Sequence, residues 1–354
     1  MIDFRYHIVS LISVFLALAV GIALGAGPLK ETIGETLTGQ VEALRAEKED
    51  LRTQLDETEG DLAAADAFVS ASGEQLLVGS LTDRRVALLL LGDVPEEEVT
   101  ALTERFAQAG AGISATVTVN ETWTDPSLAT YRRTLAGTLM SYLDQPPAAD
   151  AGAEVELAEA LVSGLVGADS ASPDTLSENA ASLLDVLAEG DRALVTFAED
   201  VTQPADAVVL VVGTPAQDGD ATPTAAPQAT TDDAQLALAG AAERLSEGAV
   251  VAGDTRSGGG VVAAVRGDDE LAGTVTTVAD ATTVTGQVVV PLALAADIGG
   301  RPGHYGYGEG LTALPPAVQL PPVDRSPVVP EVDAADAGAT PGETDGGAQP
   351  GGEG

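Results

Sequence analysis

The sequence predicts an α/β protein: an N-terminal transmembrane helix and a coiled-coil helix, followed by a Rossmann-like domain with a parallel sheet. Three observations lead to this prediction. The run from Ile8 to Gly27 holds twenty residues without a charge. A heptad repeat of apolar residues follows it, and beyond residue 82 short apolar runs alternate with amphipathic stretches. Buried strands that alternate with helices are typical of a parallel sheet.

The apolar run near the N-terminus is long enough to cross a membrane. At about 1.5 Å per residue, a helix of this length spans about 30 Å, the thickness of the hydrocarbon core. The apolar part of a secretory signal is shorter, about 7–15 residues, so we expect residues 1–29 to be an uncleaved membrane anchor. A cleaved signal peptide is the alternative. Gly21 and Gly25 form a G-x-x-x-G pattern, through which two such helices approach each other closely.

Residues 30–78 are predicted to form a coiled-coil stalk. Apolar residues recur there at alternating intervals of four and three, the pattern of helices that wind around a partner. The seam positions are Leu37, Val41, Leu44, Lys48, Leu51, Leu55, Thr58, Leu62, Ala65 and Val69. Lys48 is a polar residue in this seam, and such residues often fix the register or the number of strands. We expect a homo-oligomer or a coiled-coil partner in the same membrane; the alternative is one amphipathic helix packed on its own domain.

Residues 82–323 are predicted to form an exported α/β domain. The run "RVALLLLGD" from Arg85 is apolar without alternation, which is typical of a strand buried on both faces. A helix follows, with Asp93 as its N-cap, three glutamates in its first turn and Gly110 at its end. Further strands are predicted at residues 113–119, 192–198, 206–215, 248–254 and 275–278. Residues 283–300 predict a helix despite Pro291.

The charge of the chain excludes one class of partner. The chain carries 55 acidic and 16 basic residues, a net charge of −39. Nucleic acid is therefore no expected partner, because its phosphates are bound by Lys and Arg. Lysine occurs only at Lys30 and Lys48, so no G-x-x-x-x-G-K-[ST] phosphate loop is present. Residues 324–354 are rich in Pro, Gly and acids, which predicts a disordered acidic tail.

The sequence contains no recognisable catalytic set. There is no cysteine, and of the two histidines only His304 lies in the main domain. No G-x-S-x-G nucleophile turn accompanies it, so we expect a loop histidine bonded to backbone, no enzyme and no cofactor. The alternative is an enzyme that binds its substrate at the carboxyl ends of the parallel strands.

Two stretches resemble a known family. The opening "DFRYHIVSLISVFLALAVGIALG" with its heptad helix, and "GRPGHYGYGEG" at 300–310, resemble the actinobacterial copper transporter (MctB) family over roughly residues 1–320. The resemblance implies a cell-envelope membrane protein that acts in copper transport or efflux. It also marks His304, Tyr305 and Gly306 as a family signature without an assigned role. Related actinobacterial proteins imply the alternative, a non-catalytic coiled-coil scaffold that regulates cell-wall hydrolysis or septation through a membrane partner.

Copper ligands are scarce in this chain. Copper(I) prefers the sulfur of Cys and Met, and copper(II) prefers imidazole. Cysteine is absent, methionine occurs only at Met1 and Met140, and histidine only at His7 and His304. We therefore predict no metal site, and expect copper only as a transported ion that the protein handles indirectly or as an oligomer.

Overall fold

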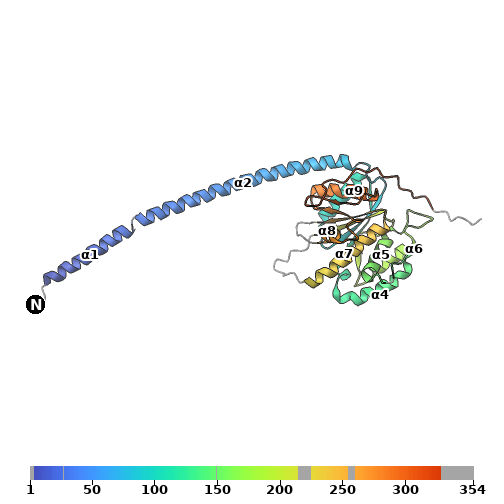
Figure 1. Cartoon of the computed structure of the whole chain (residues 1–354), viewed down its shortest axis with the longest axis horizontal. Helices are drawn as coiled ribbons and strands as arrows, with labels where there is room; N and C mark the ends of the chain where they lie inside the picture. The colour runs from blue at the N-terminus through green and yellow to red at the C-terminus, as the bar shows by residue number, and fades with distance from the viewer. Residues whose placement is uncertain (1–3, 27, 149, 214–224, 254–259, 328–354) are drawn as a thin grey trace, which may run out of the picture. The chain divides into compact units, whose positions relative to one another are not determined.

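The computed structural model describes residues 4–26, 28–148, 150–213, 225–253 and 260–327. By its internal contacts the chain divides into two units, Met1–Phe68 and Val69–Gly354. The first unit holds helix α1, Phe4–Ala26, and most of helix α2, Pro28–Leu77 (Figure 1). The apolar run and the heptad run are therefore both helical, as predicted.

The second unit is built around a sheet of seven strands in the described residues. Their order is β3-β2-β1-β4-β5-β6-β7, and every neighbouring pair is parallel except β2 with β3. The strands are β1 Arg85–Leu91, β2 Gly112–Val119, β3 Val195–Phe197, β4 Ala207–Val212, β5 Ala249–Gly253, β6 Thr276–Ala279 and β7 His304–Tyr305. This order confirms the Rossmann-like α/β fold.

Helices cover both faces of the sheet. They are α3 Glu96–Ala109, α4 Ala129–Leu139, α5 Ala153–Val166, α6 Glu178–Ala188, α7 Ala225–Leu245, α8 Val261–Gly267 and α9 Val284–Ile298. Alternate residues of β1 point to opposite faces: Leu88 joins the core cluster of α3 and α9, and Leu89 joins the cluster of α4 to α8. Figure 1 shows α9 on one side of the sheet and α4 to α7 on the other. All seven residues of β1 are buried, which confirms a strand covered on both faces.

Three local predictions were wrong. Helix α3 begins at Glu96 after Pro95, so Asp93 does not cap it. Instead the backbone of Asp93 runs against the end of β4, where a Cβ on Gly213 would lie 2.1 Å from the Asp93 carbonyl oxygen. The strand expected at 192–198 is a three-residue edge strand, antiparallel and only partly buried. His304, expected to lie in a loop, forms part of the edge strand β7.

The chain after β7 returns to the amino ends of the strands. Arg325 donates to the carbonyl oxygen of Asp83 at 2.8 Å and to the carboxylate of Asp206 at 2.5 Å. The same carboxylate oxygen of Asp206 accepts from the backbone N–H of Arg85, the first residue of β1, at 2.7 Å. The start of the predicted acidic tail thus belongs to the domain, and residues 328–354 lie outside the described residues.

Candidate functional site

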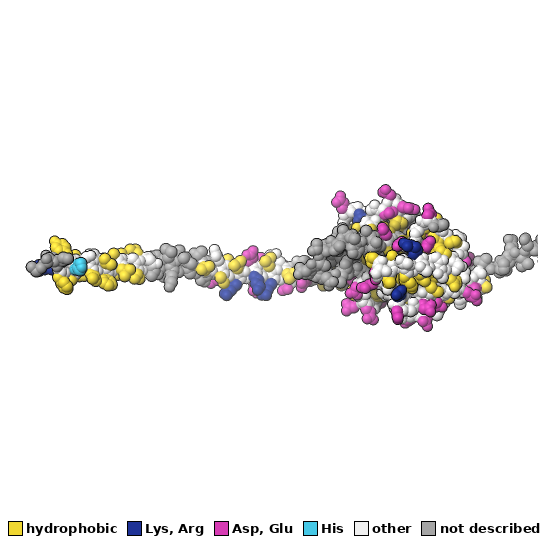
Figure 2. Space-filling view, turned by 90° about the horizontal axis from the view of Figure 1, so that it is seen from below, with side chains coloured by type: hydrophobic (Ala, Val, Ile, Leu, Met, Phe, Trp, Pro, Cys, Tyr) yellow, Lys and Arg dark blue, Asp and Glu magenta, His cyan; other side chains and the backbone are white. Residues whose placement is uncertain are grey.

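Helix α1 supplies the membrane-spanning segment. Residues Phe4–Gly25 form 22 residues of helix with a mean hydropathy of 2.6, long and apolar enough to cross a membrane. Their side chains are exposed all around the helix, as Figure 2 shows in yellow. A Cβ added to Gly21 or Gly25 would meet nothing within 4 Å, so the face that carries the G-x-x-x-G pattern is open.

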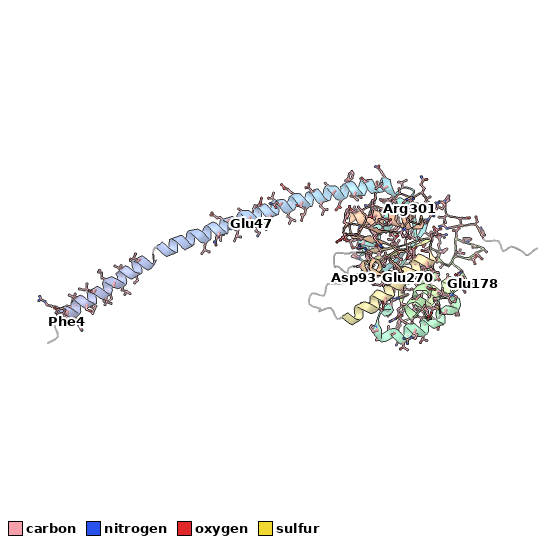
Figure 3. The ribbon with its side chains drawn as sticks, in the orientation of Figure 1. Phe4, Glu47, Asp93, Glu178, Glu270 and Arg301 are labelled. Carbon is pink, nitrogen blue, oxygen red and sulfur yellow. The ribbon has the colours of Figure 1, made fainter. Side chains whose placement is uncertain are left out.

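The predicted seam of α2 is also open. Its apolar residues are 44% to 64% exposed: Leu37, Val41, Leu44, Leu51, Leu55 and Leu62. Lys48, at the centre of this stripe, is exposed as well. Side chains project all around the stalk near Glu47 (Figure 3). A continuous apolar stripe in contact with water is unfavourable, and such stripes commonly mark a protein–protein interface.

The last turns of α2, by contrast, pack within the second unit. Leu77 is fully buried and Val69 packs against the cluster of α3 and α9. Gly73 leaves room for Val288 of α9, since a Cβ at position 73 would lie 2.6 Å from Cγ2 of that valine. The last turns of α2, residues 69–77, therefore pack on the chain's own domain, and a partner for the seam up to Leu62 stays a prediction.

His304 ties the edge strand β7 to the sheet, so the prediction of a loop was wrong although the bond to backbone is confirmed. Its Nε2 lies 3.1 Å from the carbonyl oxygen of Ala272, which only accepts, so Nε2 carries the proton. Nδ1 then accepts from the hydroxyl of Thr277 at 2.9 Å. Burial, and to a smaller extent the charge of Arg266, lowers the pKa of His304. The imidazole is neutral and leaves no nitrogen free for a copper ion.

Tyr305 and Gly306 complete the structural role of the signature. Tyr305 is 4% exposed, its hydroxyl lies 3.4 Å from the carbonyl oxygen of Arg301, and burial raises its pKa. Gly306 has a φ of 130°, and a Cβ there would lie 2.7 Å from that of Ala279. Only glycine fits this backbone conformation and this close approach. The H-Y-G segment thus builds β7 and the turn that follows it.

A buried pair of carboxyl groups lies at the amino end of β5. Asp297 of α9 is 6% exposed and accepts from the backbone N–H of Ala249 at 2.9 Å and from the hydroxyl of Thr276. Burial and the neighbouring charge of Asp297 raise the pKa of Glu243, on α7, to about 8. Burial also raises the pKa of Asp297. With a pKa of about 8, Glu243 is largely protonated at neutral pH. No sequence pattern points to this pair, because the two acids lie on different helices, far apart along the chain.

A crevice lies at the carboxyl ends of the strands. The strand order reverses between β1 and β4, and α/β proteins bind ligands beside such a point. A cavity of about 540 Å³ lies beside it, at the carboxyl ends of β1 and β2, and is lined by Gly92, Asp93, Thr118, Asn120, Glu121 and Asp191, among others. Asn120 and Thr122 both donate to the carbonyl oxygen of Ala193, at 3.0 and 2.6 Å, so these donors are already engaged. This crevice is where the enzyme alternative would place its substrate.

The scarce copper ligands do not meet. In the part of the chain that the structure describes, no three His, Cys, Asp or Glu residues are grouped so that they could hold a metal ion. Met140 packs against the hydrophobic core beside α4, and both nitrogens of His304 are engaged.

A helix long and apolar enough to cross a membrane, a second long helix with an exposed apolar stripe and a Rossmann-like domain together define a membrane-associated α/β protein. Residues 1–316 match the family described as "Copper transport outer membrane protein, MctB", and the chain belongs to this family. The "Copper transporter MctB" proteins of Mycobacterium tuberculosis (strain H37Rv) and Mycobacterium bovis are each 30% identical to it over 331 residues, 89% of this chain and 99% of theirs. That of Mycobacterium leprae is 28% identical over 337 residues, with the same coverage of 89% and 99%. The predicted resemblance is confirmed, and it favours copper transport over the scaffold alternative.

Proposed function

We propose that this protein acts in copper transport or export at the cell envelope, without catalysing a reaction. The observation that carries the proposal is the family match over residues 1–316, which includes the anchor, the stalk and the H-Y-G signature. The relatives that cover 89% of the chain are named copper transporters.

The proposed topology has one membrane crossing. Residues 1–29 stay attached as an anchor, because the 22-residue apolar helix exceeds the roughly 7–15 apolar residues of a cleaved signal. Residues 82–323 lie outside the cytoplasm, since a long acidic domain is readily translocated behind a first helix. The rest of the predicted acidic tail, residues 328–354, follows this domain.

The proposed mode of action depends on assembly. One helix makes no pore by itself. Among the described residues of the α/β domain, the imidazole of His304 is engaged and Met140 packs against the hydrophobic core, so neither offers a ready copper site. The exposed seam of α2 instead supports pairing with a second copy or with another anchored coiled coil in the same membrane. Copper handling then depends on the assembled helices.

The test is cell-associated copper in a deletion strain of the source organism. The strain is complemented with the wild-type chain, with Leu44→Asp plus Leu51→Asp in the seam, or with Thr53→Asp as a matched control on the outer face of α2. We expect copper to rise on deletion and to return to normal with the wild type and with Thr53→Asp, but not with the seam variant.

Two results would each contradict a different part of the proposal. Copper that does not change on deletion would refute the transport role, and septal defects scored in the same cultures would then support the scaffold alternative. Full rescue by the seam variant would refute the dependence on the stalk and leave the transport role in place.

A further inference from the structure

Three of the chain's 16 basic residues gather on about two turns of α2: Arg45, Lys48 and Arg52. They are exposed, and in the described part of the chain none of the three forms an ion pair. Figure 2 shows Lys and Arg side chains, in dark blue, on the exposed surface of the stalk. In a chain with a net charge of −39, unpaired cations next to an apolar seam indicate a partner that brings carboxylates to them.

The heptad positions identify those carboxylates. With Lys48 at position a of the seam, Arg45 and Arg52 occupy e positions on one flank and Glu47 occupies a g position on the other. In a parallel, in-register pair of identical helices, each g residue faces the e residue five positions further along the other helix. Glu47 of each copy therefore faces Arg52 of the other, and it also flanks the seam lysine.

An antiparallel arrangement does not have this complementarity. It places e positions beside e positions, so that Arg45 of one helix meets Arg52 of the other. The anchors also exclude it, because α1 holds the same end of every copy in the membrane.

The charge complementarity between two copies of α2 weakens toward the C-terminal end of the helix, where α2 packs on its own domain. In the parallel pair Asp61 of one copy faces Asp66 of the other, which is unfavourable. From Val69 onward α2 packs against α3 and α9 of its own chain. The self-complementary part of the helix is therefore residues 37–62, where the seam is exposed.

We propose that residues 37–62 of α2 form a parallel, in-register homodimeric coiled coil with a second copy of this chain, held by the apolar seam and by two Glu47–Arg52 ion pairs. The proposal rests on the coiled-coil part of the proposed function and is independent of copper.

The first test uses the absence of cysteine from the chain. In the full-length protein in membranes, Leu51→Cys places the only thiol at a seam position that faces its own copy. Thr53→Cys places it on the outer face as the matched control. We expect mild oxidation to convert Leu51→Cys to a disulfide-linked species of twice 35.5 kDa, and Thr53→Cys to remain unlinked. No linked dimer from Leu51→Cys, or equal yields from both variants, overturns the inference.

The second test separates a second copy from a different partner. In the Leu51→Cys background, Arg52→Glu sets like charges against each other, and we expect the dissociation constant to rise about five- to tenfold. Adding Glu47→Arg to Arg52→Glu restores opposite charges only if both helices carry both changes. Recovery of the linked dimer supports the homodimer, and its failure to recover overturns it. If the dimer forms but deletion of the protein does not change cellular copper, the proposed function is refuted and the homodimer stands.

Discussion

The buried carboxyl pair makes the stability of the α/β domain depend on pH. Replacing Glu243 by Gln removes one ionisable group and introduces an amide, whose N–H can donate a hydrogen bond to the carboxylate of Asp297. The folded state raises the pKa of Glu243 from its ordinary 4.5 to about 8, so the folded protein binds this proton more tightly than the unfolded chain. Stability from this group is complete below about pH 4.5 and is lost as pH rises to about 8.

The size of the effect follows from the pKa. A rise from 4.5 to about 8 corresponds to about 5 kcal/mol at about 1.4 kcal/mol per pKa unit. Because the side chain of Glu243 is only partly buried, solvent screening reduces this figure. We expect the wild type to lose about 2–3 kcal/mol of unfolding free energy between pH 5 and pH 9 from this group. The Glu243→Gln variant lacks this titration and should not lose that unfolding free energy.

The assay is urea unfolding of the full-length protein in detergent, followed by tryptophan fluorescence. Trp123 is the only tryptophan and is 1% exposed, so the signal reports the α/β domain. His304 titrates in the opposite sense, because its lowered pKa makes stability rise with pH, so the informative quantity is the difference between the variants. Glu189→Gln serves as an exposed control. Equal pH slopes for the wild type and Glu243→Gln would refute the reasoning.

Two further predictions concern the packing of α2 and β7. In Gly73→Val, the new Cβ alone would lie 2.6 Å from Cγ2 of Val288, so we expect the domain to lose about 1–3 kcal/mol of unfolding free energy in the same urea assay. Gly60→Val is the control, since the space around Gly60 is open and the change has no such packing cost. An unchanged midpoint for Gly73→Val would show that α2 does not dock there. His304→Ala leaves the Thr277 hydroxyl and the Ala272 carbonyl without their partner and should cost about 1–3 kcal/mol while cellular copper stays at the wild-type level. A rise in cellular copper with unchanged stability would instead give His304 a role in transport.

The central strands were predictable because burial on both faces leaves a local mark. An apolar run such as 85–91 has few alternatives to a central strand, and Gly110 ends α3 in the left-handed conformation, φ 87°, that glycine favours. The edges were not predictable in this way. Strand β7 is two residues long, and it exists because β6 offers a free edge and His304 bonds across to Thr277.

The same difference separates the candidate sites that could be predicted from those that could not. The two N-terminal helices could be predicted, since the apolar run and the heptad pattern each lie within one helix, and their roles as anchor and seam stay predictions. The carboxyl pair could not, because Glu243 and Asp297 lie on helices α7 and α9, which cover opposite faces of the sheet and meet only around the amino end of β5. The sequence likewise predicted an open seam but not its end, which is set by the contact of Val69 with the domain core.

The contacts of Arg325 make the two ends of the parallel strands in the α/β domain different from each other. The chain enters β1 and leaves after residue 327 at the same end of the strands, since Arg325 bonds to Asp83 and Asp206 beside the start of β1 and β4. The crevice around Asp93 opens at the other end of those strands. The last described residues of the chain therefore lie beside the start of β1, close to the residues that lead into this strand. Among the described residues, the opposite end of the strands carries neither of these two connections.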